Sequence, residues 1–309
     1  MNIFKLKGKA ILSPMAGVTD AAFRILAKRY GAGLVYTELI SSAALVRAIN
    51  KTNYLIQTSE EEKPVGIQLF GNNAEEVVEA AKIVQDKFDF IDINCGCPAW
   101  SVIRTGSGSE LLKNPEKIKI FVENLVKNVN IPITVKIRIG INDKNINAVK
   151  VAKLIEEAGA SAIAVHGRTR EQGYSGTANW DVISEVKSNV EIPVIGNGDV
   201  FTPEKFKECL DKSKVDGIMI ARGAIGNPYI FKQISDFIST GKYSKLDNKK
   251  IFFEYLDLAK KFDINFNLIK GHAISFTKGI EKSTELRNEL GKTKDIDEII
   301  KIYDNIVNR

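Results

Sequence analysis

The chain has 309 residues but only three cysteines, Cys95, Cys97 and Cys209, and two histidines, His166 and His272. So few cysteines exclude a disulfide-stapled scaffold. Cys95 and Cys97 are spaced too closely for a zinc knuckle, and no second pair completes four ligands. No metal site is therefore expected.

Long apolar runs are also missing. No stretch of about twenty apolar residues occurs, so no membrane-spanning helix is expected. The first residues lack the apolar segment and cleavage site of a secretory peptide. With 44% hydrophobic and 27% charged residues, the composition is that of a globular protein with a large core. We expect a cytoplasmic protein, and no obligate protein partner is evident.

Positive charge is in modest excess. A net charge of +6 permits an anionic partner without requiring one. Residues 240–309 carry 14 basic and 11 acidic side chains, a net charge of +3 over 70 residues, so positive charge is denser here than elsewhere. On charge alone, a solvated surface is the favoured interpretation of this tail, and an anion-binding surface is the alternative.

Eight short apolar segments alternate with amphipathic segments over the first 240 residues. The apolar segments are residues 10–13, 34–37, 65–69, 90–93, 133–137, 162–165, 193–195 and 217–220, and amphipathic segments include 74–87, 115–128, 145–158, 180–187 and 203–210. Strands apolar on both faces are typical of buried parallel sheets. Eight such alternations predict an α/β fold, a closed (β/α)₈ TIM barrel. The alternative is an open doubly wound sheet, which would need a glycine-rich turn after an early strand.

Helix ends are readable at several points. Asn114-Pro115 and Thr202-Pro203 have the cap-then-proline form of helix starts, and Thr19 is expected to cap the first helix. Beyond a polar break at 241–245, only helical patterns recur, at residues 250–261, 268–279 and 295–307. The sequence thus predicts a barrel domain over 1–240 and a small all-helical domain over 241–309.

Polar residues gather where the expected strands end, which is where barrel enzymes place their active sites. In chain order these are Pro14-Met15-Ala16, Thr37-Glu38, Gln68, Asn94 with Cys97, Lys136 with Arg138, His166 with Arg168, Asn197 with Asp199, and Arg222. A complete ring of such residues indicates a ligand site.

The last two strands end in glycine-rich segments, Gly196-Asn197-Gly198-Asp199 and Ala221-Arg222-Gly223. Glycines let backbone amides approach an anion, Arg222 adds paired donors, and Asn227-Pro228 can start a short helix facing it. This pattern favours the phosphate site that barrels form after strands seven and eight. Tight turns without a ligand are the alternative.

Lys136 lies at the end of an otherwise apolar strand, where an unpaired ammonium is costly. A structural ion pair with Glu38 or Asp92 is one interpretation. A flavin is the other, since a cation near ring atom N1 stabilises the reduced form, and Gln68 and Asn94 can hydrogen-bond the same ring.

Cys97 follows the fourth strand in Asn94-Cys95-Gly96-Cys97-Pro98, a turn that holds its side chain at the rim, while Cys95 is expected to pack. The glycine- and serine-rich segment 104–109 is expected to act as a lid. His166 ends the sixth strand, where a neutral imidazole can contact a ligand or serve structure alone.

Together these motifs resemble those of the tRNA-dihydrouridine synthases. The resemblance covers residues 10 to about 235, and a weaker similarity extends to Lys270-Gly271-His272 and Arg287. The matching motifs are Ser13-Pro14-Met15-Ala16-Gly17-Val18-Thr19-Asp20, Gly66-Ile67-Gln68-Leu69-Phe70-Gly71, Asp92-Ile93-Asn94-Cys95-Gly96-Cys97-Pro98, Val135-Lys136-Ile137-Arg138, His166-Gly167-Arg168-Thr169, Gly196-Asn197-Gly198-Asp199 and Ala221-Arg222-Gly223. It implies an FMN-containing barrel followed by a helical domain that grips tRNA. The implied reaction reduces the uridine 5,6 double bond: NADPH, or NADH, reduces FMN, the flavin passes hydride to C6, and Cys97 protonates C5.

The resemblance also implies roles for individual residues. Cofactor positions match Pro14, Met15, Ala16, Gln68, Lys136, His166, Asn197, Gly198, Asp199, Ala221 and Arg222, and substrate contacts are expected from Asn94, Arg168, Lys270 and Arg287. One departure is that Trp100-Ser101 stands where the family often has lysine. Three rival functions are an FMN barrel acting on a free pyrimidine, like dihydroorotate dehydrogenase, a non-catalytic RNA-binding protein, and a flavin-free phosphate-binding isomerase.

Overall fold

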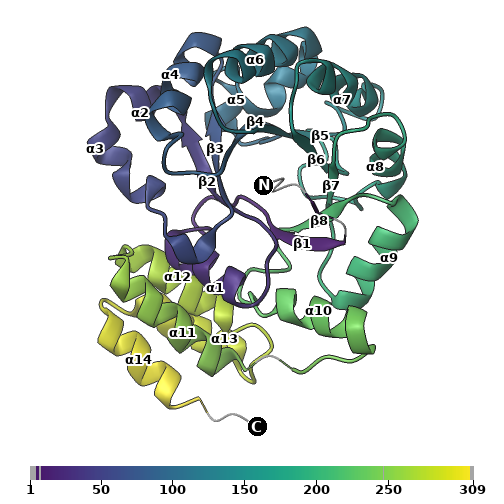
Figure 1. Ribbon diagram of the computed structural model, residues 1–309. Coiled ribbons are helices and arrows are strands. Elements are labelled where there is room, and N and C mark those ends of the chain that lie inside the picture. The colour runs from purple at the N-terminus through teal and green to yellow at the C-terminus, as the bar shows by residue number, and fades with distance from the viewer. Residues whose placement is uncertain (1–4, 7, 246, 307–309) are drawn as a thin grey trace.

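The computed structural model describes residues 5, 6, 8–245 and 247–306, with only the backbone at 50 and 51. Eight parallel strands form one sheet in the order β1-β8-β7-β6-β5-β4-β3-β2. Their bounds are β1 Lys9–Leu12, β2 Val35–Ser41, β3 Val65–Phe70, β4 Phe90–Cys95, β5 Ile133–Arg138, β6 Ala162–His166, β7 Val194–Asn197 and β8 Gly217–Ile220. The strands surround a common centre and the helices lie outside them (Figure 1).

The sheet closes on itself where its first two strands meet. The backbone N–H of Leu12 donates to the carbonyl of Leu34 at 3.0 Å, and that of Gly33 donates to Ala10 at 2.8 Å. These bonds join the β1 edge to the segment that enters β2. The (β/α)₈ prediction is therefore confirmed, and the open-sheet alternative is wrong.

The interior of the barrel is filled by side chains from β1, β2, β4, β6, β7 and β8 and from residues just before β1 and β2. They form a separate buried cluster of Leu6, Ile11, Leu34, Tyr36, Phe90, Ala162, Ala164, Ile195 and Met219. Gly66 on β3 is needed here, because a Cβ at this position would lie 2.1 Å from the Phe90 ring. Among the described residues, the barrel interior is thus a packed core and not a channel.

Seven longer helices cover the sheet, and shorter turns link them. The long helices are α1 Ala21–Arg29, α4 Ala74–Val84, α6 Pro115–Asn128, α7 Ala148–Glu157, α8 Trp180–Lys187, α9 Pro203–Ser213 and α10 Ile230–Thr240, and the short ones are α2 Ser42–Arg47, α3 Ile49–Thr52, η1 Asn53–Ile56, η2 Glu60–Glu62, α5 Trp100–Ile103 and η3 Gly108–Lys113. Asn114 and Thr202 cap α6 and α9 as predicted. The cap of α1 is Asp20 instead of Thr19, because the Thr19 hydroxyl is bonded to Met15.

Four helices follow α10: α11 Asn248–Lys261, α12 Phe266–Phe276, α13 Ser283–Lys292 and α14 Ile296–Asp304. They stand together beside α1 (Figure 1). Three of them match the predicted helical segments, although residue 307 of the last segment lies outside the described residues. Helix α13 was not predicted, because only Leu290 of its ten residues is buried and no apolar stripe marks it. In the part of the chain that the structure describes, no helix is long and apolar enough to cross a membrane.

Candidate active site

A cavity of about 660 Å³ opens at the C-terminal ends of the strands. This size is within the range of about 300–1,000 Å³ usual for small-molecule sites. Its walls include every residue expected to bind a cofactor: Pro14, Met15, Ala16, Gln68, Lys136, His166, Asn197, Gly198, Asp199, Ala221 and Arg222. Asn94 and Cys97 also line it. Residues from all eight strands, distant in sequence, thus converge on one space.

A second hollow, of about 880 Å³, lies in the tail, away from these residues. Its walls carry the carboxyl groups of Glu285 and Glu289 and the lysines Lys245 and Lys282. None of the residues predicted for catalysis or cofactor binding lines it. We therefore place the candidate active site at the barrel rim, although the tail hollow is larger.

Lys136 projects from β5 into the rim cavity. Its Nζ donates to Asn197 Oδ1 at 3.1 Å, and the Asn197 amide in turn donates to the carbonyl of Met219 at 2.8 Å. Among the residues described, Lys136 forms no ion pair, so the structural pairing with Glu38 or Asp92 is not made. Burial, reinforced by nearby Arg138, lowers the pKa of Lys136 to about 8, which leaves it mostly protonated at neutral pH.

A chain of buried hydrogen bonds runs from the barrel interior to Cys97. Asp92 accepts from Thr134 Oγ1 at 2.5 Å and from Gln68 Nε2 at 2.7 Å. Gln68 Oε1 accepts from Asn94 Nδ2 at 2.8 Å, and Asn94 Oδ1 accepts from the Cys97 backbone N–H at 2.9 Å. Burial raises the pKa of Asp92 to about 6, against the opposing effect of these hydrogen bonds. Each polar group in the chain fixes the next.

The turn that carries Cys97 is held from a second side. The Cys97 carbonyl accepts hydrogen bonds from both the backbone N–H and the hydroxyl of Ser109, at 3.0 and 2.9 Å. Gly108 must be glycine here, since its φ is +61° and a Cβ would lie 2.7 Å from the Cys97 carbonyl oxygen. Ser107 and Ser109 are both buried. The expectation that segment 104–109 forms a free lid is therefore wrong for 107–109, which pack against the turn.

The three cysteines lie in different environments. Cys97 is partly exposed at the cavity wall, whereas Cys95 and Cys209 are buried. Burial raises the pKa of both buried thiols, that of Cys209 to about 11. Cys97 is the thiol that a ligand in the cavity can reach.

His166 ends β6 at the cavity and is 9% exposed. Burial, together with the positive charges of Lys136, Arg138, Arg168 and Arg222, lowers its pKa to about 2. The imidazole is therefore neutral at physiological pH and offers one donor and one acceptor.

The segments after β7 and β8 are joined through the Asp199 carboxylate. It accepts from Arg168 at 2.7 Å, from Arg222 at 2.9 Å and from the backbone N–H of Ala178 at 2.8 Å. Burial alone would raise the pKa of Asp199, but the Arg168 and Ala178 hydrogen bonds and the two guanidinium charges outweigh it and lower that pKa. The carboxylate therefore serves to hold Arg222 at the cavity wall.

Arg168 is placed differently from what the sequence suggested. Its side chain is 2% exposed and does not line the cavity. Besides Asp199, its nitrogens donate to the carbonyls of Ser175 at 3.0 Å and Gly176 at 2.6 Å. The guanidinium is thus a brace behind the cavity wall, and we do not assign it a substrate contact.

Two aromatic residues at the rim escaped sequence reasoning. The guanidinium of Arg222 lies 4.9 Å from the ring centre of Tyr174 and 5.4 Å from that of Phe201. Both rings line the cavity, and they are 63% and 43% exposed. They come from loops with no periodic pattern, so an aromatic residue near a strand end was the only available signal. Arg138, which the sequence places at a strand end without indicating a role, lines the cavity and donates to the Gly96 carbonyl at 3.0 Å.

The loop after β1, which carries Pro14, Met15 and Ala16, is held in place by hydrogen bonds to neighbouring elements. The backbone N–H of Met15 donates to Thr19 Oγ1 at 3.1 Å, and that of Gly17 donates to Glu38 Oε2 at 2.6 Å. The Thr19 carbonyl accepts from the Arg24 guanidinium at 2.7 Å. The loop shape is thus fixed by side chains of α1 and β2.

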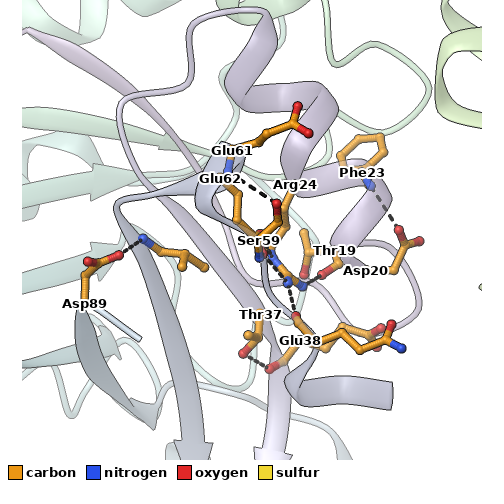
Figure 2. A network of polar contacts seen from close by, with 12 residues as sticks. Thr19, Asp20, Phe23, Arg24, Thr37, Glu38, Ser59, Glu61, Glu62 and Asp89 are labelled. Atoms are coloured by element: carbon orange, nitrogen blue, oxygen red, sulfur yellow. Dashed lines mark hydrogen bonds and ion pairs between the residues drawn. The ribbon is translucent and has the colours of Figure 1, made fainter. Parts of the chain in front are cut away.

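Arg24 is itself part of a buried ion pair. Its Nε lies 2.5 Å from Glu62 Oε2, and the two side chains are 2% and 0% exposed. The guanidinium also donates to the Gln57 carbonyl at 2.7 Å, and Glu62 accepts from the backbone N–H of Ser59 at 2.9 Å. Figure 2 shows this pair where α1 meets the segment before β3. Both buried charges are therefore matched by charge and by hydrogen bonds.

Lys270 and Arg287 lie in the tail, outside the cavity. Lys270 Nζ donates to the Thr293 carbonyl at 3.1 Å and lies over the Phe266 ring. Arg287 donates to the hydroxyls of Thr277 and Ser283 at 3.2 and 3.1 Å. Both side chains thus lie between α12 and α13, one at each end of the contact.

Solved structures of similar shape support the barrel. One is a histamine dehydrogenase from Rhizobium sp. 4-9, with a TM-score of 0.60 and 16% identity over 81% of this chain and 49% of that one, so the chain spans about half its length. Another is an old yellow enzyme homologue from Zymomonas mobilis, with a TM-score of 0.50 and 13% identity over 78% of this chain and 90% of that one. At such low identity these likenesses establish the fold alone.

Sequence comparison goes further. The family model described as "Dihydrouridine synthase (Dus)" matches residues 11–307. A tRNA-dihydrouridine synthase B of Shewanella oneidensis is 40% identical over 266 residues, 84% of this chain and 82% of that protein. A probable tRNA-dihydrouridine synthase of Rickettsia bellii is 37% identical over 324 residues, 99% of this chain and 98% of that protein. The chain, with its ring of cavity residues around Cys97, therefore belongs to the dihydrouridine synthase family of oxidoreductases.

Proposed function

We propose that this enzyme reduces the 5,6 double bond of uridines in tRNA to dihydrouridine, with FMN as cofactor and NADPH or NADH as electron donor. The observation that carries the proposal is the position of Cys97, an accessible thiol at the wall of a cavity lined by all the expected cofactor residues. Family membership supports the reaction class, and the named relatives support the tRNA substrate. We place the reaction in the cytoplasm.

The donors around the cavity fit FMN. The Lys136 ammonium has three N–H donors, of which the hydrogen bond to Asn197 uses one, and it suits the electron-rich side of a flavin ring. Gln68 and the neutral His166 would hydrogen-bond ring atoms. Arg222 and the backbone of the glycine-containing segment at Gly198 would hold the phosphate. Bound FMN would supply the hydride that the uridine accepts.

Cys97 supplies the other half of the reduction. As hydride arrives at C6, negative charge develops toward C5 and the adjacent carbonyl, and the thiol gives its proton to C5. The uracil ring gains one hydride and one proton, and the thiolate recovers its proton from water. Asn94 and Ser109 hold the backbone on both sides of the thiol, which fixes the direction of proton delivery.

A free-pyrimidine reductase on the same barrel would not need the helical tail. The likeness to the Rickettsia bellii relative covers 99% of the chain, tail included. The direct test is to purify the protein, record the flavin spectrum, and incubate it with NADPH and unmodified tRNA. We expect dihydrouridine on nucleoside analysis. Turnover of free uridine or orotate without any product in tRNA would refute the proposal.

Two tail side chains provide a test of how tRNA is held. Converting Lys270 and Arg287 to glutamine should weaken tRNA binding. The slope of the logarithm of the binding constant against the logarithm of salt concentration should become shallower by roughly one to two units, because each phosphate contact releases a counterion. FMN content and flavin reduction by NADPH should not change, since both residues lie outside the cavity. The measurement is tRNA affinity by filter binding across a series of salt concentrations.

The matched control converts Lys150 and Lys153, two exposed lysines of α7, to glutamine. Helix α7 lies across the barrel from the tail (Figure 1). This variant loses the same charge but should keep the wild-type salt slope. Equal slopes in both variants would show that the tail charges form an ordinary solvated face.

Arg222→Ala tests the phosphate site. It should lower FMN affinity about tenfold or more, because a charged, paired donor to the phosphate is lost. Flavin that does bind should still be reduced by NADPH. The measurement is FMN titration of the flavin-free protein, and an unchanged dissociation constant would remove Arg222 from the phosphate site.

A further inference from the structure

Asp20 lies where the loop after β1 ends and α1 begins. Its Oδ1 accepts from the backbone N–H of Phe23 at 2.9 Å and so caps the helix. Its Oδ2 contacts two side chains of the tail, the Tyr255 hydroxyl at 3.1 Å and His272 Nε2 at 3.0 Å. One carboxylate therefore serves both the barrel and the tail.

This junction is buried and closely packed. Asp20 is 6% exposed, His272 2% and Tyr255 0%. The His272 ring stacks on Phe23, with ring centres 4.9 Å apart, and its centre lies 4.3 Å from that of Tyr255. Apolar side chains would suffice to dock helices on a barrel, and a buried carboxylate is costly unless its partners are well placed. The polar contact therefore selects one arrangement of tail against loop.

Helix α12, which carries His272, also meets the segment after β8. Gly226 has a φ of +68°, and a Cβ there would lie 2.1 Å from the Ser275 carbonyl oxygen of α12. Only glycine permits this close approach. The helix thus rests on two loops at once, and residues of both loops, including Met15 and Arg222, line the rim cavity.

We propose that Asp20, Tyr255 and His272 are positioning residues through which the helical tail holds the loop after β1 in its FMN-binding shape. The inference rests on the proposed function, because FMN is the ligand concerned. The path is short: Asp20 follows Thr19, whose hydroxyl is bonded to the backbone of Met15. FMN affinity therefore depends on tail residues that do not themselves line the cavity.

Two buried tyrosines of the tail offer a matched test. Tyr255→Phe removes a hydrogen bond to Asp20, whereas Tyr303→Phe removes a hydrogen bond of 2.6 Å to the Ala273 carbonyl, within the tail. Both variants of the full chain lose one buried hydroxyl. We expect Tyr255→Phe to raise the FMN dissociation constant about tenfold, the scale of one hydrogen bond to a charged group. Tyr303→Phe should lower the melting temperature but leave the dissociation constant unchanged.

Asp20→Ser is the second variant. Serine caps helices about as well as aspartate, so α1 should keep its start while the contacts to Tyr255 and His272 are lost. FMN affinity should fall as in Tyr255→Phe, and the visible circular dichroism of the bound flavin should change in both variants, reporting an altered ring environment. Titrations are made well below the melting temperature of each protein.

The possible outcomes separate the two proposals. Weaker FMN binding in Tyr255→Phe and Asp20→Ser, but not in Tyr303→Phe, supports the positioning role. Wild-type FMN affinity and circular dichroism in Tyr255→Phe and Asp20→Ser overturn it and leave the proposed function standing. An equal loss of affinity in Tyr303→Phe also overturns it, since general loosening of the tail would then explain the effect. A wild-type protein that binds no FMN overturns the proposed function, and this inference with it.

Discussion

Cys97→Ala is expected to slow uridine reduction by about 10²–10⁴-fold, the usual contribution of a general acid. FMN should remain bound, because the Cys97 backbone is held by Asn94 and Ser109 independently of the side chain. Oxidation of NADPH by the flavin should also persist, since that half-reaction requires no proton at C5. The measurement is single-turnover formation of dihydrouridine in tRNA by the pre-reduced variant.

The control for this variant is Cys209→Ala. Cys209 is buried in α9 and does not line the cavity, so its removal should leave the single-turnover rate unchanged. A Cys97→Ala enzyme that forms dihydrouridine at the wild-type rate would contradict the role of Cys97 as the acid. Loss of FMN from that variant would contradict the separation of acid and cofactor contacts.

Arg24→Met should lower the free energy of unfolding by about 3–5 kcal/mol, because it leaves the Glu62 carboxylate buried without its counter-charge. The measurement is urea denaturation of the flavin-free protein, in which a signal that reports on barrel structure monitors unfolding. The double variant Arg24→Met/Glu62→Met should recover much of that loss, since no unpaired buried charge is left.

Helix α1 also supplies the comparison for this prediction. Arg29 pairs with Glu61 at 2.6 Å, but the two side chains are 49% and 41% exposed. Arg29→Met should therefore leave the unfolding free energy nearly unchanged, because solvent already screens the pair. Equal effects of Arg24→Met and Arg29→Met would show that burial does not govern the strength of the Arg24–Glu62 pair.

The barrel and most of its cavity wall followed from the sequence for a physical reason. Parallel strands buried on both faces must be short and apolar, so polar residues such as Lys136 and Arg222 stand out where each strand ends. Closure of the barrel then brings those ends together. The order of the strands along the chain thus predicts that the ends carrying Gln68 and Asn94 lie side by side, although these residues are 26 positions apart in the sequence.

Features that depend on contacts between distant segments could not be read in this way. Thr19 is as good a helix cap as Asp20, and only its hydrogen bonds to Met15 explain why Asp20 takes the role. Segment 104–109 has the composition of a mobile loop, yet Ser109 finds a partner in the Cys97 carbonyl. Arg168 is placed at a strand end like the cavity residues, but its guanidinium binds the Asp199 carboxylate, which lies 31 residues further along the chain.

The buried chain beneath Cys97 has a direction. A carboxylate only accepts hydrogen bonds, so Asp92 makes Gln68 turn its NH₂ group inward and its oxygen toward Asn94. Asn94 must then turn its own oxygen to the backbone of Cys97. The other end of the chain imposes the same orientation, because the backbone N–H groups of Gly96 and Cys97 can only donate and both point at Asn94 Oδ1, at 3.2 and 2.9 Å. A carboxylate at one end and two backbone N–H groups at the other thus assign every amide nitrogen and oxygen between them, so this wall of the cavity presents one fixed pattern of donors and acceptors.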